Sequence, residues 1–76
     1  MAWVAVDKST VECIFGNKPK RKVGHWEDID YIVHFVYGKE VACEIDTGLV
    51  LPKGSIKKLI GRDLTWEDEP VELKEE

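Results

Sequence analysis

Apolar and polar positions alternate along most of the chain, a pattern that predicts β-strands rather than helices. Apolar, β-branched and aromatic residues dominate residues 3–6 and 10–15, and the turn-forming residues Asp7, Lys8 and Ser9 separate the two runs. Two such runs joined by a short turn predict an antiparallel hairpin. We therefore expect the chain to begin with two paired strands.

The segment Tyr31–Tyr37 has the strongest strand pattern in the chain. Apolar residues occupy both of its alternating sets, and a strand that is apolar on both faces is usually covered on both. We therefore expect it at the centre of the sheet. After a turn at residues 38–40, the segment Val41–Asp46 alternates between apolar and acidic residues, which predicts a second strand with one face in solvent.

One short helix is predicted between Ser55 and Gly61. Ile56, Leu59 and Ile60 are spaced to form a single apolar stripe. Ser55 is a favourable N-cap residue, and Gly61 is a favourable C-cap residue. Because two helical turns do not persist alone in water, we expect the stripe to close the core against a sheet.

These elements predict an α+β fold, with one antiparallel meander of four to five strands and one short helix. A small SH3-like barrel is the alternative. A chain of 76 residues has room for one domain, which we place at residues 1–66. Residues 67–76 form an acidic C-terminal segment that we expect to be partly ordered at most, with residues 71–73 as an edge segment.

The formal net charge of −4 is unevenly distributed along the chain. Residues 66–76 contain six acids and only Lys74 as a base, so most of the acidity is C-terminal. This segment is interpreted as a solvated tail that aids solubility, and the alternative is a tail that masks a basic surface. The sequence has neither an apolar run that could span a membrane nor a signal peptide, so we expect a cytoplasmic protein without a membrane partner.

A basic cluster followed by an aromatic residue is the candidate binding site. Its cations could neutralise phosphates, and an exposed indole could stack on a base, so the cluster suggests a nucleic-acid-binding module as one function. The net negative charge disfavours that function, and the alternative is a solvated loop with the indole in the core. The candidate residues are Lys18, Lys20, Arg21, Lys22 and Trp26.

Two further patterns suggest a protease site and a zinc site, but the rest of the sequence supports neither. Asp46-Thr47-Gly48 is the tripeptide of retroviral-type aspartic proteases, whose two aspartates share a proton. Only ten residues separate it from Leu59, where a similar glycine-arginine-acid segment begins, and that span cannot hold a flap. An aspartic-protease-like dimer at Asp46 is therefore the remotest alternative.

Cys13 and Cys43 are expected to be free thiols. With His25 and His34 they lack the spacing of a zinc site, so we expect no metal and no cofactor. The sequence has no serine-histidine-acid set in readable order, so we also expect no enzymatic activity.

The two ends of the chain resemble small uncharacterised proteins encoded by phages and prophages of gut bacteria. The resemblance lies in residues 3–8, 51–61 and 64–71, and it includes no catalytic signature. It implies an accessory role in a phage or mobile element. Together with the small size, it predicts a non-enzymatic protein that binds an unidentified protein partner. The exposed edges of so small a sheet make a homodimer a further expectation.

Overall fold

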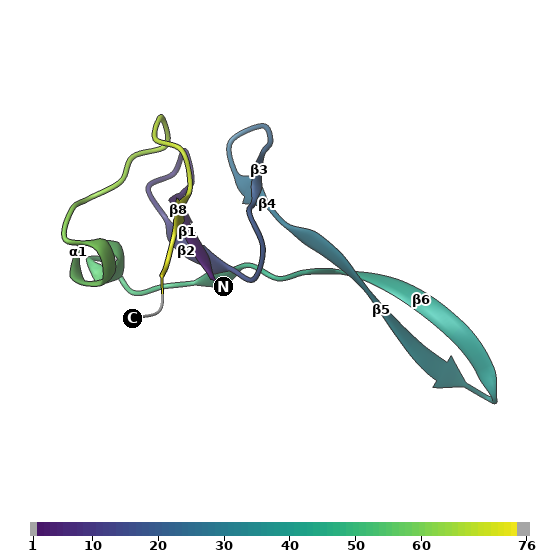
Figure 1. The fold of residues 1–76 in the computed structure, drawn as a ribbon. Coiled ribbons are helices and arrows are strands. Elements are labelled where there is room, and N and C mark those ends of the chain that lie inside the picture. The colour runs from purple at the N-terminus through teal and green to yellow at the C-terminus, as the bar shows by residue number, and fades with distance from the viewer. Residues whose placement is uncertain (1, 75–76) are drawn as a thin grey trace.

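The computed structural model describes residues 2–74, which form antiparallel strands in three open sheets and one short helix (Figure 1). The predicted α+β class is confirmed. The single meander is wrong, because the largest sheet has the order β7-β2-β1-β8 and two further pairs, β3-β4 and β5-β6, stand apart. The elements are β1 Trp3–Val6, β2 Glu12–Phe15, β3 Lys20–Arg21, β4 Trp26–Glu27, β5 Ile29–Val36, β6 Lys39–Asp46, β7 Leu49–Val50, α1 Ser55–Ile60 and β8 Val71–Glu72.

The predicted N-terminal hairpin is confirmed, and its two strands are the inner strands of the four-stranded sheet. β1 pairs with β2 from Trp3 opposite Phe15 to Val6 opposite Glu12, and with β8 on its other edge. Successive side chains of a strand point to opposite faces, so β1 contributes to two clusters. Val4 and Val6 pack with buried residues 56 and 64 on one face, whereas Ala5 packs with buried residues 13, 15 and 26 on the other.

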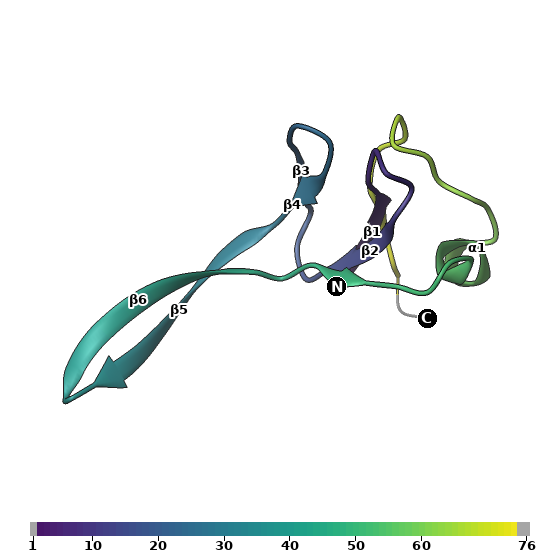
Figure 2. The ribbon, with the colours of Figure 1, turned by 180° about the vertical axis from the view of Figure 1, so that it is seen from behind.

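The prediction that residues 31–37 form the central strand is wrong. This segment belongs to β5, which among residues 2–74 pairs only with β6, and the two strands form a hairpin that projects from the rest of the described chain (Figures 1 and 2). We call residues 29–46 the arm and the other described residues the body. The two strands of the arm contain eight residues each, whereas the strands of the body contain two to four residues.

The predicted helix is confirmed, but its predicted N-cap is wrong. Gly54 is the N-cap and Ser55 is the first helical residue; the Ser55 hydroxyl donates to the carbonyl of Pro52 at 2.5 Å. The carboxylate of Glu12 on β2 instead accepts the free amides of Gly54 at 2.6 Å and Ile56 at 2.7 Å. A carboxylate at a helix N-terminus satisfies unpaired amides and favours the helix dipole. At the other end, Gly61 adopts the left-handed conformation predicted for a C-cap, with φ 80°, and its amide donates to the backbone carbonyl of Lys57.

We expect Glu12→Ala to destabilise the protein by about 2 kcal/mol, because it leaves the Gly54 and Ile56 amides without their acceptor. Urea unfolding followed by tryptophan fluorescence measures this loss. Ser55→Ala is the matched control, with an expected loss below about 1 kcal/mol. A larger loss for Ser55→Ala than for Glu12→Ala would contradict the assignment of Glu12 as the cap.

The residues after Trp66 continue the body. Thr65 and Asp68 form a local turn, in which the Thr65 amide donates to the Asp68 carboxylate at 2.8 Å. Pro70 is buried, and β8 then forms the edge segment predicted at residues 71–73. Glu75 and Glu76, which belong to the predicted acidic segment, lie outside the described residues. Among residues 2–74, no helix is long and apolar enough to cross a membrane.

Candidate binding surface

The arm is an extended hairpin that projects from one side of the body (Figures 1 and 2). The molecule is accordingly elongated, with principal extents of 48, 33 and 19 Å. Tyr37 and Gly38 connect the strands with φ of 50° and 78°. Positive φ at both central residues of a two-residue loop is typical of a type I′ turn, whose twist matches that of the strands. The turn therefore fixes the register in which the arm pairs.

The pairing register gives the arm two different faces. Antiparallel partners lie on the same face, so the Tyr31–Glu44 and Phe35–Glu40 pairs define a face with aromatic and acidic side chains. The Ile32–Cys43 and His34–Val41 pairs define the opposite, mainly aliphatic face. The aromatic face contains residues 29, 31, 33, 35, 40, 42, 44 and 46, and the aliphatic face contains residues 30, 32, 34, 36, 39, 41, 43 and 45.

Both faces of the arm are open to solvent. Phe35 is 71% exposed, Tyr31 is 65% exposed and Tyr37 at the tip is completely exposed. On the aliphatic face, Ile32 and Ile45 are 45% and 38% exposed. The predicted alternation of β6 is therefore present, but neither of its faces is covered by the body.

Acidic groups accompany the aromatic face. The arm contains four carboxylates and a single lysine, Lys39. The Tyr31 hydroxyl donates to the Glu44 carboxylate at 3.1 Å, a contact that orients the ring across the two strands. This hydrogen bond, followed by the negative charge of Glu44, raises the pKa of Tyr31. The aromatic face thus presents apolar rings among anionic side chains.

A hydrogen-bond network holds the root of the arm, which we define as the flanking residues Asp28 and Thr47. One carboxylate oxygen of Asp28 accepts the Thr47 hydroxyl at 2.6 Å, the Asn17 amide at 3.0 Å and the Asn17 side chain at 3.2 Å. The Thr47 amide donates to the Asp28 carbonyl at 2.9 Å, and the Thr47 hydroxyl accepts the Gly16 amide at 3.1 Å. These contacts tie both ends of the arm to the loop that follows β2.

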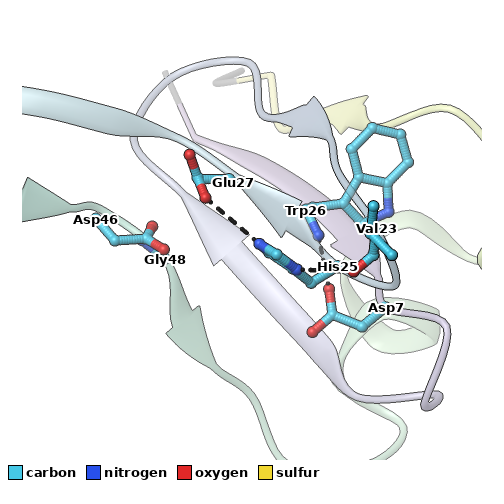
Figure 3. Close-up of polar contacts among 7 residues, drawn as sticks. All are labelled: Asp7, Val23, His25, Trp26, Glu27, Asp46 and Gly48. Carbon is cyan, nitrogen blue, oxygen red and sulfur yellow. Dashed lines mark hydrogen bonds and ion pairs between the residues drawn. The ribbon is translucent and has the colours of Figure 1, made fainter.

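The Asp46-Thr47-Gly48 tripeptide forms the end of β6 and this root. The Asp46 carboxylate accepts the Gly48 amide at 2.8 Å (Figure 3), which is a local turn contact. A Cβ on Gly48 would lie 2.6 Å from the Phe15 ring, so only glycine allows the chain to pass Phe15 here. Each residue of the tripeptide therefore has a structural contact at the point where the arm leaves the body.

The predicted basic site is divided between packed and exposed side chains. Trp26 is buried, and its indole nitrogen donates to the Val6 carbonyl at 2.9 Å. The Arg21 guanidinium lies 4.7 Å from the centre of the Trp26 ring and 4.8 Å from that of Trp66, at the distance of cation–π contacts. Trp26 is therefore unavailable for stacking on a base, and Arg21 packs against it.

The three lysines of the predicted site are exposed. Lys18 lies 5.7 Å from the Trp3 ring. Lys20 and Lys22 line a shallow hollow together with two carboxylates, Glu27 and Asp28. The basic cluster thus includes the short strand β3, and its exposed lysines lie beside acidic neighbours.

The cysteines and histidines do not form a common site. Cys13 is buried in the body, and burial together with the nearby Asp7 carboxylate raises the pKa of its thiol to about 11. Cys43 is a free thiol on the arm. His25 lies 3.4 Å from Glu27 (Figure 3). Within residues 2–74, no group of three or more ligand side chains is placed to hold a metal ion.

A hollow of about 420 Å³ lies between the β1–β2 turn and residues 63–67. Two of its acids already have structural partners. Asp7 accepts the Trp26 amide at 3.0 Å (Figure 3), and Glu12 caps the helix. The hollow is therefore bordered by groups that stabilise the body, and the arm remains the surface with the largest number of unpartnered apolar side chains.

The arm was not predicted as a binding surface from the sequence. Apolar residues on both faces of a strand predict burial, although they are equally compatible with a two-sided contact surface. The signal in the sequence that indicates a projecting arm is the length of its two strands. Strands of eight residues around a two-residue turn extend roughly 27 Å at 3.4 Å per residue, beyond the reach of four-residue neighbours.

Comparison of the chain with protein-family models, with curated proteins and with solved structures gives no match. The resemblance of the chain ends to phage and prophage proteins stays a prediction.

Proposed function

We propose that this is a non-enzymatic binding protein that docks to a protein partner through the arm. The observation that carries the proposal is the exposure of apolar side chains on both faces of a hairpin that makes no sheet contact with the body. Monomeric soluble proteins rarely expose contiguous apolar surface of this kind, and such surface usually marks an interaction site. The body then acts as a folded base that presents the hairpin.

The composition of the aromatic face supports this role. Tyrosine and other large aromatic residues contribute much of the binding free energy in protein interfaces, because they bury a large area with little loss of side-chain entropy. Tyr31 and Phe35 are exposed on one face and are flanked by Glu40 and Glu44. This arrangement fits a partner with an apolar cleft and basic residues at its rim.

The geometry favours the arm over the basic loop as the functional surface. Nucleic-acid binding through the basic cluster would use Arg21 and Trp26, but Trp26 is buried, and the Arg21 guanidinium, although exposed, already contacts the Trp26 ring. The exposed Lys20 and Lys22 have Glu27 and Asp28 beside them, and these carboxylates would repel a phosphate backbone. The apolar side chains of the arm have no comparable internal partners.

A photo-crosslinking amino acid at position 35 tests the proposal in cells that produce the native partner. We expect a discrete crosslinked protein, and we expect Tyr31→Ser to weaken binding of that purified protein at least tenfold. The matched control places the crosslinker at Val23, which is 98% exposed but lies on the body. Crosslinks from position 23 only, or unchanged affinity of the Tyr31→Ser variant, would contradict docking through the arm.

A further inference from the structure

We propose that the free edge of β5 pairs with β5 of a second copy of this chain. The two strands run antiparallel around a two-fold axis at Val33, which joins two arms into one sheet of four strands, β6-β5-β5-β6. This inference rests on the proposed role of the arm as the binding element, and it names a partner for its edge. The two faces of the joined arms remain open to a different protein.

The type I′ turn determines which backbone groups point to the free edge. In a two-residue hairpin the residues that flank the turn, Val36 and Lys39, form a hydrogen-bonded pair, and such pairs alternate along the ladder with pairs whose amides point outward. The outward amides of β5 therefore belong to Ile29, Tyr31, Val33 and Phe35. Consistent with this, the Tyr31 amide donates to the side chain of Asp30 at 2.8 Å rather than to β6.

A two-stranded hairpin in water needs further strands or a covering layer for stability. The arm has neither, because β5 and β6 pair only with each other and both faces are exposed. Exposed edges are normally protected by lysine, proline or a bulge. β5 contains neither lysine nor proline, and its pairing with β6 is continuous from Ile29 to Val36.

Self-pairing of β5 brings complementary side chains together. In the register centred on Val33, Tyr31 of each copy lies opposite Phe35 of the other, and cross-strand aromatic pairs are favourable. The single charged residue of β5, Asp30, lies opposite Val36. No charge therefore opposes a like charge along the whole edge, which is the requirement for an interface that uses the same surface on both subunits.

The edge of β6 does not have this property in the two registers that centre on the middle of the strand. An antiparallel pair around a two-fold axis places residues of the same face opposite each other. Centred on Ala42, it sets Glu40 opposite Glu44; centred on Cys43, it sets Glu40 opposite Asp46. Like charges directly opposite each other destabilise the pairing. In these central registers, the charge pattern of the arm thus favours association through β5 over association through β6.

Pairing along one strand edge buries less surface than a standard interface, in which each partner buries roughly 800 Å². We therefore expect a reversible dimer whose population rises with concentration in sedimentation equilibrium of the full chain.

Proline substitution of cross-strand neighbours tests the choice of edge. Val33→Pro removes an outward amide from β5, whereas Ala42→Pro removes the corresponding outward amide from β6, directly opposite Val33. We expect Val33→Pro to weaken dimerisation at least tenfold and Ala42→Pro to leave it within twofold. A monomeric wild-type protein, equal effects of the two variants, or a larger effect of Ala42→Pro would overturn the proposal. Near-UV circular dichroism of the body tryptophans verifies that both variants fold.

A cysteine at position 33 provides an independent test of the register. In the Cys43→Ser background, Val33→Cys places two thiols opposite each other with Cα atoms about 5.5 Å apart, within disulfide range. Phe35→Cys, the control, places them roughly 13 Å apart. We expect a disulfide-linked dimer from Val33→Cys alone, and crosslinking from Phe35→Cys alone would overturn the register.

The crosslinking result at position 35 separates this inference from the proposed function. A monomeric chain whose position 35 still crosslinks to a different protein would contradict pairing through β5 and leave the arm as the binding element. A dimer blocked by Val33→Pro, without a crosslink to any other protein, would support the pairing and contradict docking to a different protein.

Discussion

Ile56→Asp is expected to unfold the body, whereas Leu59→Asp is expected to leave it folded. The Ile56 side chain is 1% exposed and packs with Val4, Val6 and Leu64 beneath the helix. An aspartate there would be an unpaired charge in an apolar cluster, which we expect to cost more than about 4 kcal/mol. A core of this size supplies roughly 3–5 kcal/mol of net stability, so the folded population would be largely lost.

Leu59→Asp is the matched control because it makes a similar chemical change on the same helix. The apolar stripe predicts that Leu59 is buried and that this substitution unfolds the domain, but Leu59 is 50% exposed. We expect a loss below about 1 kcal/mol, as for other surface substitutions. Far-UV circular dichroism and urea unfolding measure both variants. Unfolding of Leu59→Asp, or a folded Ile56→Asp variant, would contradict the observed packing of the helix.

Trp26→Ala is expected to cost about 4 kcal/mol, close to the effect of other deletions of large aromatic side chains. The Trp26 indole donates to the Val6 carbonyl, contacts Trp66 edge-on with ring centres 5.6 Å apart, and lies under Arg21. Its removal leaves a cavity and an unpaired carbonyl in the second core cluster. Urea unfolding, followed by the fluorescence of the other two tryptophans, measures the loss.

The charge of Arg21 can be tested separately from the ring. Arg21→Met keeps an apolar stem over Trp26 but removes the cation, so we expect a loss of about 1 kcal/mol. Lys20→Met makes the same kind of change at an exposed neighbour and is expected to alter stability by less than about 0.5 kcal/mol. If both variants lost the same free energy, the contact of Arg21 with the indoles would not contribute to folding.

Much of the body was predictable because local signals determine it. The Asp7–Ser9 turn produces the β1–β2 hairpin, and Gly61 ends the helix at the expected residue. The N-cap could not be predicted in the same way, since Glu12 reaches the helix from a strand more than 40 residues earlier. No local pattern indicates that contact. The turn formed by Thr65 and Asp68 is another local feature, because its two residues are three apart in the sequence.

The arm shows why burial is harder to predict than secondary structure. The alternation in residues 31–37 correctly indicated a strand, but a strand pattern does not specify what lies on each face. An exposed, two-sided apolar hairpin and a buried central strand have the same composition. For the basic cluster, the sequence identified the side chains but could not distinguish Lys20, which faces solvent, from Arg21, which stacks on two indoles.

The root of the arm has a consequence for how the hairpin could change in length. The chain leaves the body at Asp28 and returns at Thr47, and these two residues are joined by a backbone hydrogen bond of 2.9 Å. Deleting two residues from β5 and their two partners from β6 would therefore shorten the hairpin, yet preserve both the pairing register and the side to which each residue points. The same folded base could in this way carry hairpins of different reach, so insertions and deletions at residues 29–46 have a natural unit of two cross-strand pairs.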